Sequence, residues 1–292
     1  MMKTSTQMLV VLAICMIGVG CSSSNEPTNN TNSLKGYIYY SGSGNIYRVK
    51  LSDHTATELF SNARHPEIIA NGNILCIEET PVPRIFFSDL TGANRQTVIE
   101  GEGYSGPTHK VYMNRPRISY NQNYVVYEGD NISNPITYVV DASSGDLIVT
   151  IGDKASNQPL FSPSWVPDGS IVVQGETTKN NGIYKVAADF SSIVRIDPNL
   201  SNVSEPSVSP DGKSIAFIRD GKIWVMGIDG SSPTQLNTTA TKLHMICWSP
   251  DSKYIAVVSS GKIHILDPIA LTDTEITNSR YVDTGHQLSW VY

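Results

Sequence analysis

A pattern of strand, turn and strand that recurs along the chain constrains the fold more than any other feature. The clearest copy runs from Val208 to Phe217, where Pro210 followed by Asp211-Gly212 suits a tight turn between two strands. A second hairpin turn follows at Asp220-Gly221. This segment therefore predicts three consecutive antiparallel strands.

Weaker copies can be aligned on the apolar or aromatic residue just before each first turn. These register residues are Ile68, Ile118, Trp165, Val208, Trp248 and Trp290, and neighbouring ones lie 40 to 50 residues apart. Most are followed by a turn-forming pair such as Asp168-Gly169 or Asp251-Ser252. Repeats of this length, with four short strands each, are the signature of β-propeller blades.

The sixth copy predicts how the ring closes. Residues 289–292 match only the first strand of a blade, and three further strands are expected at 36–40, 46–50 and 57–60. An open ring would leave an unpaired strand edge at each end. We therefore predict an all-β fold over residues 34–292, a six-bladed β-propeller of four-stranded antiparallel blades, with the C-terminal strand completing blade 1.

The N-terminal region has the features of an export signal. Lys3 precedes an apolar run over residues 8–19, which suits a signal-peptide core and is short for a membrane-spanning helix. Residues 17–21 resemble a bacterial lipobox, in which Cys21 becomes the lipidated N-terminus. We expect a lipoprotein signal peptide over 1–20, and the lipidated cysteine with a flexible tether over 21–33. The alternative is ordinary secretion with cleavage nearby.

Charge and cysteine content narrow the function. A formal net charge of −6 and a pI near 5.5 argue against nucleic-acid binding, which favours a basic face. The sequence holds no P-loop, CxxC, HExxH or GxSxG motif. Cys76 and Cys247 are the only thiols of the predicted propeller, and they fall on blades that blade 1 separates, so we expect buried free thiols.

The unit over 208–237, and the copy from Trp248 to Ala256, resemble the propeller repeats of the TolB family. This resemblance implies the propeller fold, but not one function, because such propellers occur in translocation proteins, peptidases and lyases. TolB proteins carry an additional N-terminal domain, whereas we expect only a tether here. Propeller-type prolyl peptidases add a hydrolase domain, and oligogalacturonate lyases have a longer, seven-bladed form with a histidine-rich metal site.

Candidate site residues follow from the position of the first strands, which line the channel of a propeller. The Pro-Asp-Gly turns lie at one end and are expected to serve folding. At the other end, three and four positions before the register residues, stand Arg64-His65, Asn114-Arg115, Ser204-Glu205, His244 and His286-Gln287. Three imidazoles from neighbouring blades could bind a metal, or one could act as a base.

The offset of each histidine from its register residue indicates which of these side chains can lie close together. His244 and His286 share one offset, whereas His65 is shifted by one residue and could point to the other side of its strand. The pair His244 and His286 with Gln287 is therefore favoured over a triad. The alternative is that these are solvated or locally hydrogen-bonded loop residues.

An insertion over 101–117 lies at the same end of the channel and carries Tyr104, His109, Lys110, Tyr112, Arg115 and Arg117. Tyrosine and arginine side chains there could stack on sugars or bind carboxylates. The alternative is a variable loop that covers a blade edge.

These features predict a lipid-anchored envelope protein, monomeric and held at the outer membrane, that binds a protein or glycan without catalysis. Membrane contact is expected through the anchor only, with no nucleic acid and no cofactor. The alternative is a glycan-acting, lyase-like enzyme with a histidine and arginine site, with or without a divalent metal. The candidate ligand-binding residues are His65, His244, His286, Gln287, Arg115, Glu205, Tyr104, His109 and Tyr112.

Overall fold

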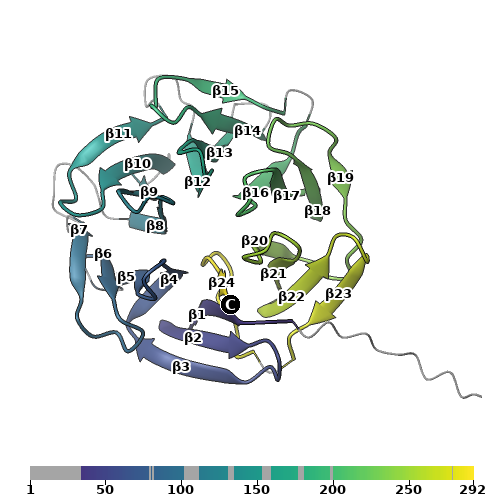
Figure 1. Ribbon diagram of the computed structural model, residues 1–292, viewed down its shortest axis with the longest axis horizontal. Helices are drawn as coiled ribbons and strands as arrows, with labels where there is room; N and C mark the ends of the chain where they lie inside the picture. Colours follow the sequence, from purple (N-terminus) through teal and green to yellow (C-terminus); the bar gives the residue numbers. More distant parts are fainter. Residues whose placement is uncertain are drawn as a thin grey trace, which may run out of the picture. The chain divides into compact units, whose positions relative to one another are not determined.

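The computed structural model forms six four-stranded antiparallel sheets arranged as blades around a central channel (Figure 1). It describes residues 34–78, 80, 82–101, 112–130, 135–152, 159–176, 181–197, 200–277 and 279–292. Within these ranges every regular element is a strand, and no helix is long and apolar enough to cross a membrane. The all-β, six-bladed prediction is confirmed.

Each blade is one meander that runs from the channel to the rim. Blades 1 to 3 are built, from the innermost strand outward, of β24 (Ser289–Val291), β1 (Tyr37–Gly42), β2 (Asn45–Lys50) and β3 (Ala56–Ser61); β4 (Ala63–Ile68), β5 (Ile74–Glu78), β6 (Arg84–Ser88) and β7 (Gln96–Glu100); and β8 (Tyr112–Ile118), β9 (Tyr124–Asp130), β10 (Pro135–Asp141) and β11 (Leu147–Ile151).

Blades 4 to 6 follow the same order, and in blades 2 to 6 the register residue is the last residue of the innermost strand. Their strands are β12 (Leu160–Trp165), β13 (Ile171–Glu176), β14 (Asn181–Val186) and β15 (Ile193–Arg195); β16 (Val203–Val208), β17 (Ser214–Arg219), β18 (Lys222–Gly227) and β19 (Thr234–Gln235); and β20 (Leu243–Trp248), β21 (Ile255–Ser259), β22 (Lys262–Asp267) and β23 (Thr272–Glu275).

The ring closes as the sixth repeat predicts. Strand β24 pairs antiparallel with β1, and Trp290 lies opposite Ile38. The Trp290 indole Nε1 donates a hydrogen bond to the Lys35 carbonyl oxygen at 3.1 Å, and its side chain is 5% exposed. Blade 1 is therefore built from both ends of the propeller sequence, which removes two unpaired edges.

The core is divided into six apolar clusters, one at each interface between neighbouring blades. Strand β21, for example, is buried along its whole length, with side chains reaching blade 5 on one face and blade 1 on the other. Cys76 on β5 and Cys247 on β20 are buried and free, as expected from their separation. No blade buries its faces alone, so each depends on both neighbours.

Five of the six innermost strands depart from regular pairing at the same position. Each of the five has a residue with positive φ three positions before the register residue, at His65, Arg115, Ser162, Glu205 and Met245. Strand pairing shifts register at each of these points. This is a β-bulge, which bends the strand and breaks the strict alternation of side chains. The first four of these residues are followed by proline.

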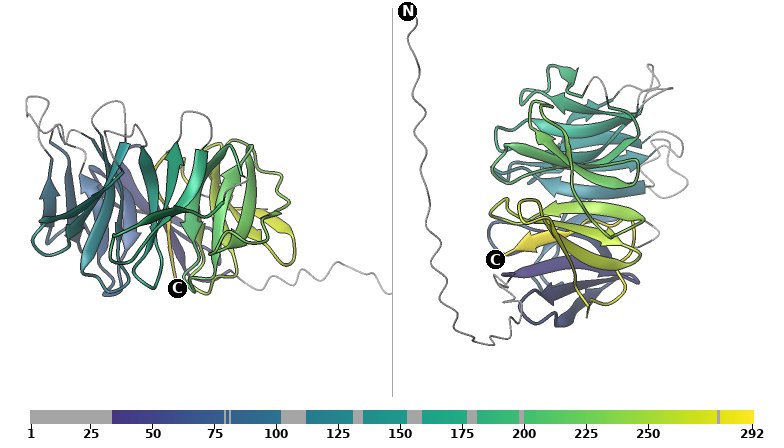
Figure 2. Two further views of the ribbon diagram at one scale, coloured as in Figure 1. Left: turned by 90° about the horizontal axis from the view of Figure 1, so that it is seen from above. Right: turned by 90° about the vertical axis from the view of Figure 1, so that its right-hand side faces the viewer.

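The strands run between two faces of the propeller (Figure 2). We call the end of the channel at the turns between first and second strands the turn end, and the opposite end the entry end. The C-terminal strand points to the turn end. Residues 1–33, with the predicted signal peptide, Cys21 and the tether, lie outside the described residues, and those assignments stay predictions.

Closure makes Trp290 a test of the fold. Trp290→Ala should lower the free energy of unfolding by about 3–5 kcal/mol, the usual cost of truncating a buried tryptophan. Chemical denaturation measures this loss. Ile269→Ala, at a side chain that is 88% exposed, is the matched control and should change stability little. Equal effects of the two substitutions would contradict the closure role.

Candidate functional site

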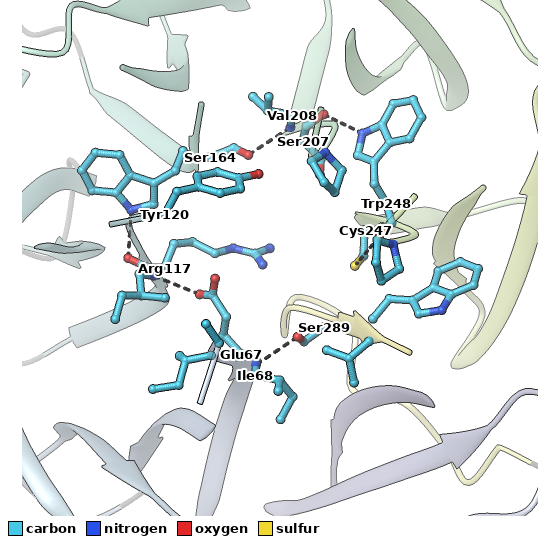
Figure 3. Close-up of a pocket in the computed structure, with 18 of the residues that line it drawn as sticks. Glu67, Ile68, Arg117, Tyr120, Ser164, Ser207, Val208, Cys247, Trp248 and Ser289 are labelled. Carbon is cyan, nitrogen blue, oxygen red and sulfur yellow. Dashed lines mark hydrogen bonds between the residues drawn. The ribbon is translucent and has the colours of Figure 1, made fainter. Parts of the chain in front are cut away.

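A cavity lies at the turn end of the channel (Figure 3). Its volume is about 420 Å³, and its wall includes residues from the first-to-second-strand turns, such as Ala70, Tyr120, Pro210 and Pro250. Sequence reasoning assigned this end to folding alone. The structure shows that the same turns also surround a pocket on the propeller axis.

One side chain from every blade lines this pocket. Each stands one position before a register residue, and together they are Glu67, Arg117, Ser164, Ser207, Cys247 and Ser289. Because they occupy equivalent positions on six strands, they form a ring at one level of the channel, which we call the inner ring. Aligning the repeats could have found this ring, since its members directly precede the register residues.

Hydrogen bonds between blades hold three members of the inner ring in place. Ser289 Oγ accepts from the backbone N–H of Ile68 at 3.0 Å, and Ser164 Oγ accepts from Val208 N–H at 3.0 Å. A carboxylate oxygen of Glu67 accepts from Ile118 N–H at 3.2 Å. Each bond joins a ring member to the register residue of the next blade, so ring and closure depend on one another.

Aromatic side chains complete the wall of the pocket. The Trp165 indole donates to the Arg117 carbonyl oxygen at 3.0 Å, and the Trp248 indole donates to the Ser207 carbonyl oxygen at 2.9 Å. Toward solvent, Tyr120 is 51% exposed. These register tryptophans therefore join adjacent blades and form part of the pocket wall.

The Arg117 guanidinium points into the middle of the pocket (Figure 3). Among the described residues it makes no hydrogen bond and no ion pair within 4.0 Å. Its charge lowers the pKa values of Glu67, Tyr120 and Cys247, although burial outweighs this effect in all three. The pocket therefore contains a cation whose five N–H donors are unused by the described part of the protein.

Burial dominates the two other titratable members of the inner ring. It raises the pKa of Glu67 from 4.5 to about 7, although Arg117 and the Ile118 N–H oppose this shift. It raises the pKa of the Cys247 thiol to about 11, against the opposing effects of Arg117 and the Trp290 backbone. Cys247 is thus a protonated thiol near neutral pH, and Glu67 changes its charge there.

The entry end contains a second cavity of about 340 Å³, near which the sequence placed the site. There Arg115 pairs with Glu128 at 3.1 Å and with Glu205 at 2.7 Å, and it also contacts the Ser162 hydroxyl. Glu128 further accepts from Asn114 Nδ2 at 3.3 Å. Arg115 and Glu205 were both expected to bind a ligand, and in the structure they form an ion pair with each other.

The structure brings together His65, His286 and Gln287. The two imidazole centroids lie 4.5 Å apart, and Gln287 Nε2 donates to the His65 carbonyl oxygen at 3.0 Å and to that of Pro116 at 2.9 Å. Burial first, and the neighbouring His286 second, hold the pKa of His65 well below its usual range. His65 is therefore neutral near pH 7.

This arrangement differs from the favoured pairing of His244 with His286. His65 sits at the bulge of β4, which overrides the one-residue offset that was expected to turn it away. His244 lies on β20 opposite Val258, and no ring contact in the described structure joins it to the other two histidines. Within the described ranges, no cluster of three or more His, Cys, Asp or Glu side chains could hold a metal ion.

The remaining candidates come from the insertion at the entry end. Tyr112 begins β8 and is 46% exposed, with the Arg64 guanidinium 5.6 Å from its ring centroid. It lines the second cavity together with Phe161 and Gln174. Tyr104 and His109 lie outside the described residues, and their roles stay predictions.

Comparison with known proteins identifies the repeat. A family model described as the TolB beta propeller domain matches residues 77–287. The structure of TolB from Acinetobacter baumannii aligns with a TM-score of 0.68 at 16% identity, over 87% of this chain and 66% of that chain. A putative TolB from Agrobacterium tumefaciens aligns with a TM-score of 0.66 at 15% identity, over 88% and 99%.

The propeller fold also occurs in an enzyme among the similar structures. A puromycin-hydrolysing peptidase from Mycobacterium tuberculosis aligns with a TM-score of 0.59 at 12% identity, over 82% of this chain and 44% of that chain. At such identities structural likeness shows the fold alone. The chain also spans slightly less than two thirds of the Acinetobacter protein.

Arg115 and Arg117 provide a matched pair of variants, because they stand two residues apart on β8. Arg115→Met leaves Glu128 and Glu205 without their cation and should lower the free energy of unfolding by about 3–5 kcal/mol. Arg117→Met breaks no ion pair and should cost less than about 1 kcal/mol. Denaturation at pH 6, where Glu67 is mostly protonated, measures both. Equal costs would show that Arg117 also has a structural partner.

Glu67→Gln tests the proton held in the inner ring. Folded Glu67 keeps its proton up to about pH 7, whereas the unfolded chain loses it near 4.5. The stability that this proton contributes is full below pH 4.5 and is lost as the pH rises through 7. Between pH 4.5 and 8 the wild type should therefore lose up to about 3 kcal/mol relative to Glu67→Gln. Parallel stability curves for the two proteins would contradict this.

Proposed function

This chain belongs to the TolB beta propeller family, and from that membership we propose that it is a non-catalytic binding module that holds a segment of a partner protein at the turn end of its channel. The observation that carries the proposal is the pocket on the propeller axis, to which all six blades contribute one inner-ring side chain. A concave site with an apolar wall and few converging polar groups is the usual form of a ligand pocket.

The composition of the pocket suits a polypeptide. Tryptophan, tyrosine and arginine are the side chains that contribute most to protein interfaces. Trp165, Trp248 and Trp290 form the wall, Tyr120 and Tyr292 stand at the mouth, and Arg117 lies at the centre. A side chain or chain end of a partner can enter this cavity while the partner's surface rests on the surrounding turns.

The entry end supports a non-catalytic function in a different way. Arg115 was the residue expected to bind an acidic sugar in the enzyme alternative, and its charge is already balanced by Glu128 and Glu205. The histidines expected to take a proton in that alternative were His244 and His286, and among the described residues His286 has its ring contact with His65 instead. Arg115 is therefore not placed as an anion-binding group should be.

The same proposal includes the cellular location. An export signal over residues 1–20, with Cys21 lipidated, would hold the propeller at the bacterial envelope on the tether of residues 21–33. Ser22 replaces the aspartate that commonly retains lipoproteins at the inner membrane of enteric bacteria, which favours the outer membrane. A monomer would then present the turn end to a partner protein in the envelope.

Filling the pocket tests the proposed function. The Ser207 side chain lines the pocket, and its hydroxyl makes no hydrogen bond within the described structure, so Ser207→Trp fills the cavity without removing a known contact. The full chain is immobilised, proteins of an envelope extract are captured, and the affinity of a purified captured protein is measured by calorimetry. We expect at least a hundredfold weaker binding to Ser207→Trp than to the wild type.

Tyr112→Ala, at the cavity of the entry end, is the control and should bind the captured protein like the wild type. Thermal unfolding confirms that both variants are folded. Unchanged affinity of Ser207→Trp would contradict binding at the turn end. A loss of affinity in Tyr112→Ala alone would show that the partner binds at the entry end.

A further inference from the structure

We propose that the turn-end pocket binds one carboxylate group of the partner's polypeptide through Arg117, and that Glu67 takes up a proton when this carboxylate binds. The inference rests on the proposed function, because it names the chemical group that the pocket recognises.

The guanidinium of Arg117 donates no hydrogen bond to the described residues. A guanidinium presents five N–H donors in a planar fork, and a carboxylate accepts two of them in parallel. On the same strand, Arg115 donates from one terminal nitrogen to Glu128 and from the other to Glu205. Arg117 has no such acceptor among the described residues, although it points into an open cavity. An anionic oxygen pair from a ligand would complete it.

The hydroxyl groups of the inner ring add further donors. Ser164 and Ser289 each use an oxygen lone pair to accept a backbone N–H, which leaves the hydroxyl proton available. Ser207 makes no hydrogen bond through its hydroxyl in the described structure. The pocket is thus rich in donors, and Glu67 is the only carboxylate side chain among the residues that line it.

A comparison of equivalent positions in the blades shows that the hydrogen bond made by Glu67 does not require a charged side chain. Glu67 accepts a backbone N–H from the next blade, and at the equivalent positions Ser164 and Ser289 make the same bond with a neutral hydroxyl. A serine would therefore be sufficient for the fold at this position. Blade packing does not require the charges of Glu67 and Arg117. Removing a charge from water costs free energy unless it is paired, so we infer that these charges are kept to bind a ligand.

Charge balance selects the class of ligand. Arg117 is the only cationic side chain among the residues that line the pocket, so the site matches one negative charge. A phosphate carries more charge and would need a second cation. A carboxylate carries one charge and fits the arginine fork.

Proton uptake follows from the position of Glu67. Three titratable groups face it, namely Arg117 and Tyr120 from blade 3 and Cys247 from blade 6. Only Arg117 is charged at neutral pH, and it would be shared with an incoming carboxylate. A second negative charge beside ionised Glu67 would be repelled, so the ligand favours the protonated form. Burial already brings the pKa of Glu67 to about 7, so this proton is exchangeable near neutrality.

Peptide pools test the inference directly. Three pools of N-acetylated hexapeptides, otherwise of random uncharged sequence, are offered to the purified full chain and the retained peptides are quantified by mass spectrometry. The first pool ends in a free carboxylate, the second in an amide, and the third in an amide with one internal glutamate. At pH 6 we expect the first or third pool to be retained at least tenfold more than the second.

The pH dependence identifies the proton. If bound carboxylate requires protonated Glu67, the excess retention should fall about tenfold from pH 6 to pH 8, because each pH unit above a pKa of about 7 reduces the protonated fraction about tenfold. Glu67→Gln should keep the same excess at both pH values. Arg117→Gln should abolish it, and Arg117→Lys, which keeps the charge without the fork, should retain part of it.

The outcomes separate this inference from the proposed function. Equal retention of acid and amide pools, or no retention of any pool by the wild type, overturns carboxylate recognition, while the captured partner and Ser207→Trp still decide the proposed function. An unchanged preference at pH 8 overturns proton uptake. Thermal unfolding confirms that the variants are folded. Should Arg117→Gln not fold, the pH dependence of wild type against Glu67→Gln decides alone.

Discussion

The pairing of β24 with β1 is the interaction on which the rest of the structure depends. All six apolar clusters are shared between two neighbouring blades, so every blade needs both of its neighbours to bury its faces. If the C-terminal strand were unpaired, blade 1 would lose its channel-lining strand, and Trp290 would leave the cluster between blades 1 and 6. The inner ring exists only because closure directs six strands toward one axis.

The two ends of the channel differ in how they compensate the charge of a partly buried arginine. Arg115 and Arg117 project from one strand and are both partly buried, but their surroundings come from different parts of the ring. Glu128, from the second strand of the same blade, and Glu205, from blade 5, neutralise Arg115. No described carboxylate lies within ion-pair distance of Arg117. One arginine therefore serves the fold, and the other is available to a ligand.

Much of the fold was predictable because its determinants are local. Turn pairs such as Asp211-Gly212 and the register tryptophans set the blade boundaries, and both depend on a few adjacent residues. The β-bulges were not predicted, although proline after His65, Arg115, Ser162 and Glu205 was a visible signal that these strands depart from regular pairing. The bulge explains why His65 approaches His286 against the expectation from its offset.

The candidate site was less predictable, because it depends on distances across the ring. The ion pair of Arg115 with Glu205 joins residues 90 positions apart, and no local pattern reports it. Sequence reasoning therefore treated the two arginines of the insertion alike and selected only Arg115 as a candidate site residue, because the carboxylates that pair with Arg115 lie on other strands. Likewise, the turn end was assigned to folding because its turns are the best-formed pattern, although the pocket lies between those turns.

The half-buried Glu67 lowers the stability of the ligand-free protein near neutral pH, because its ionisation is disfavoured in the folded state and not in the unfolded chain. Serine at the equivalent position of two other blades shows that the fold does not require this cost. Departures from local optimality in otherwise repetitive structures are expected at functional sites. The blades of a propeller can be compared with one another, so a place where one blade departs from the others is a physical indicator of function. Here that place adjoins Arg117, which has no ion-pair partner among the described residues.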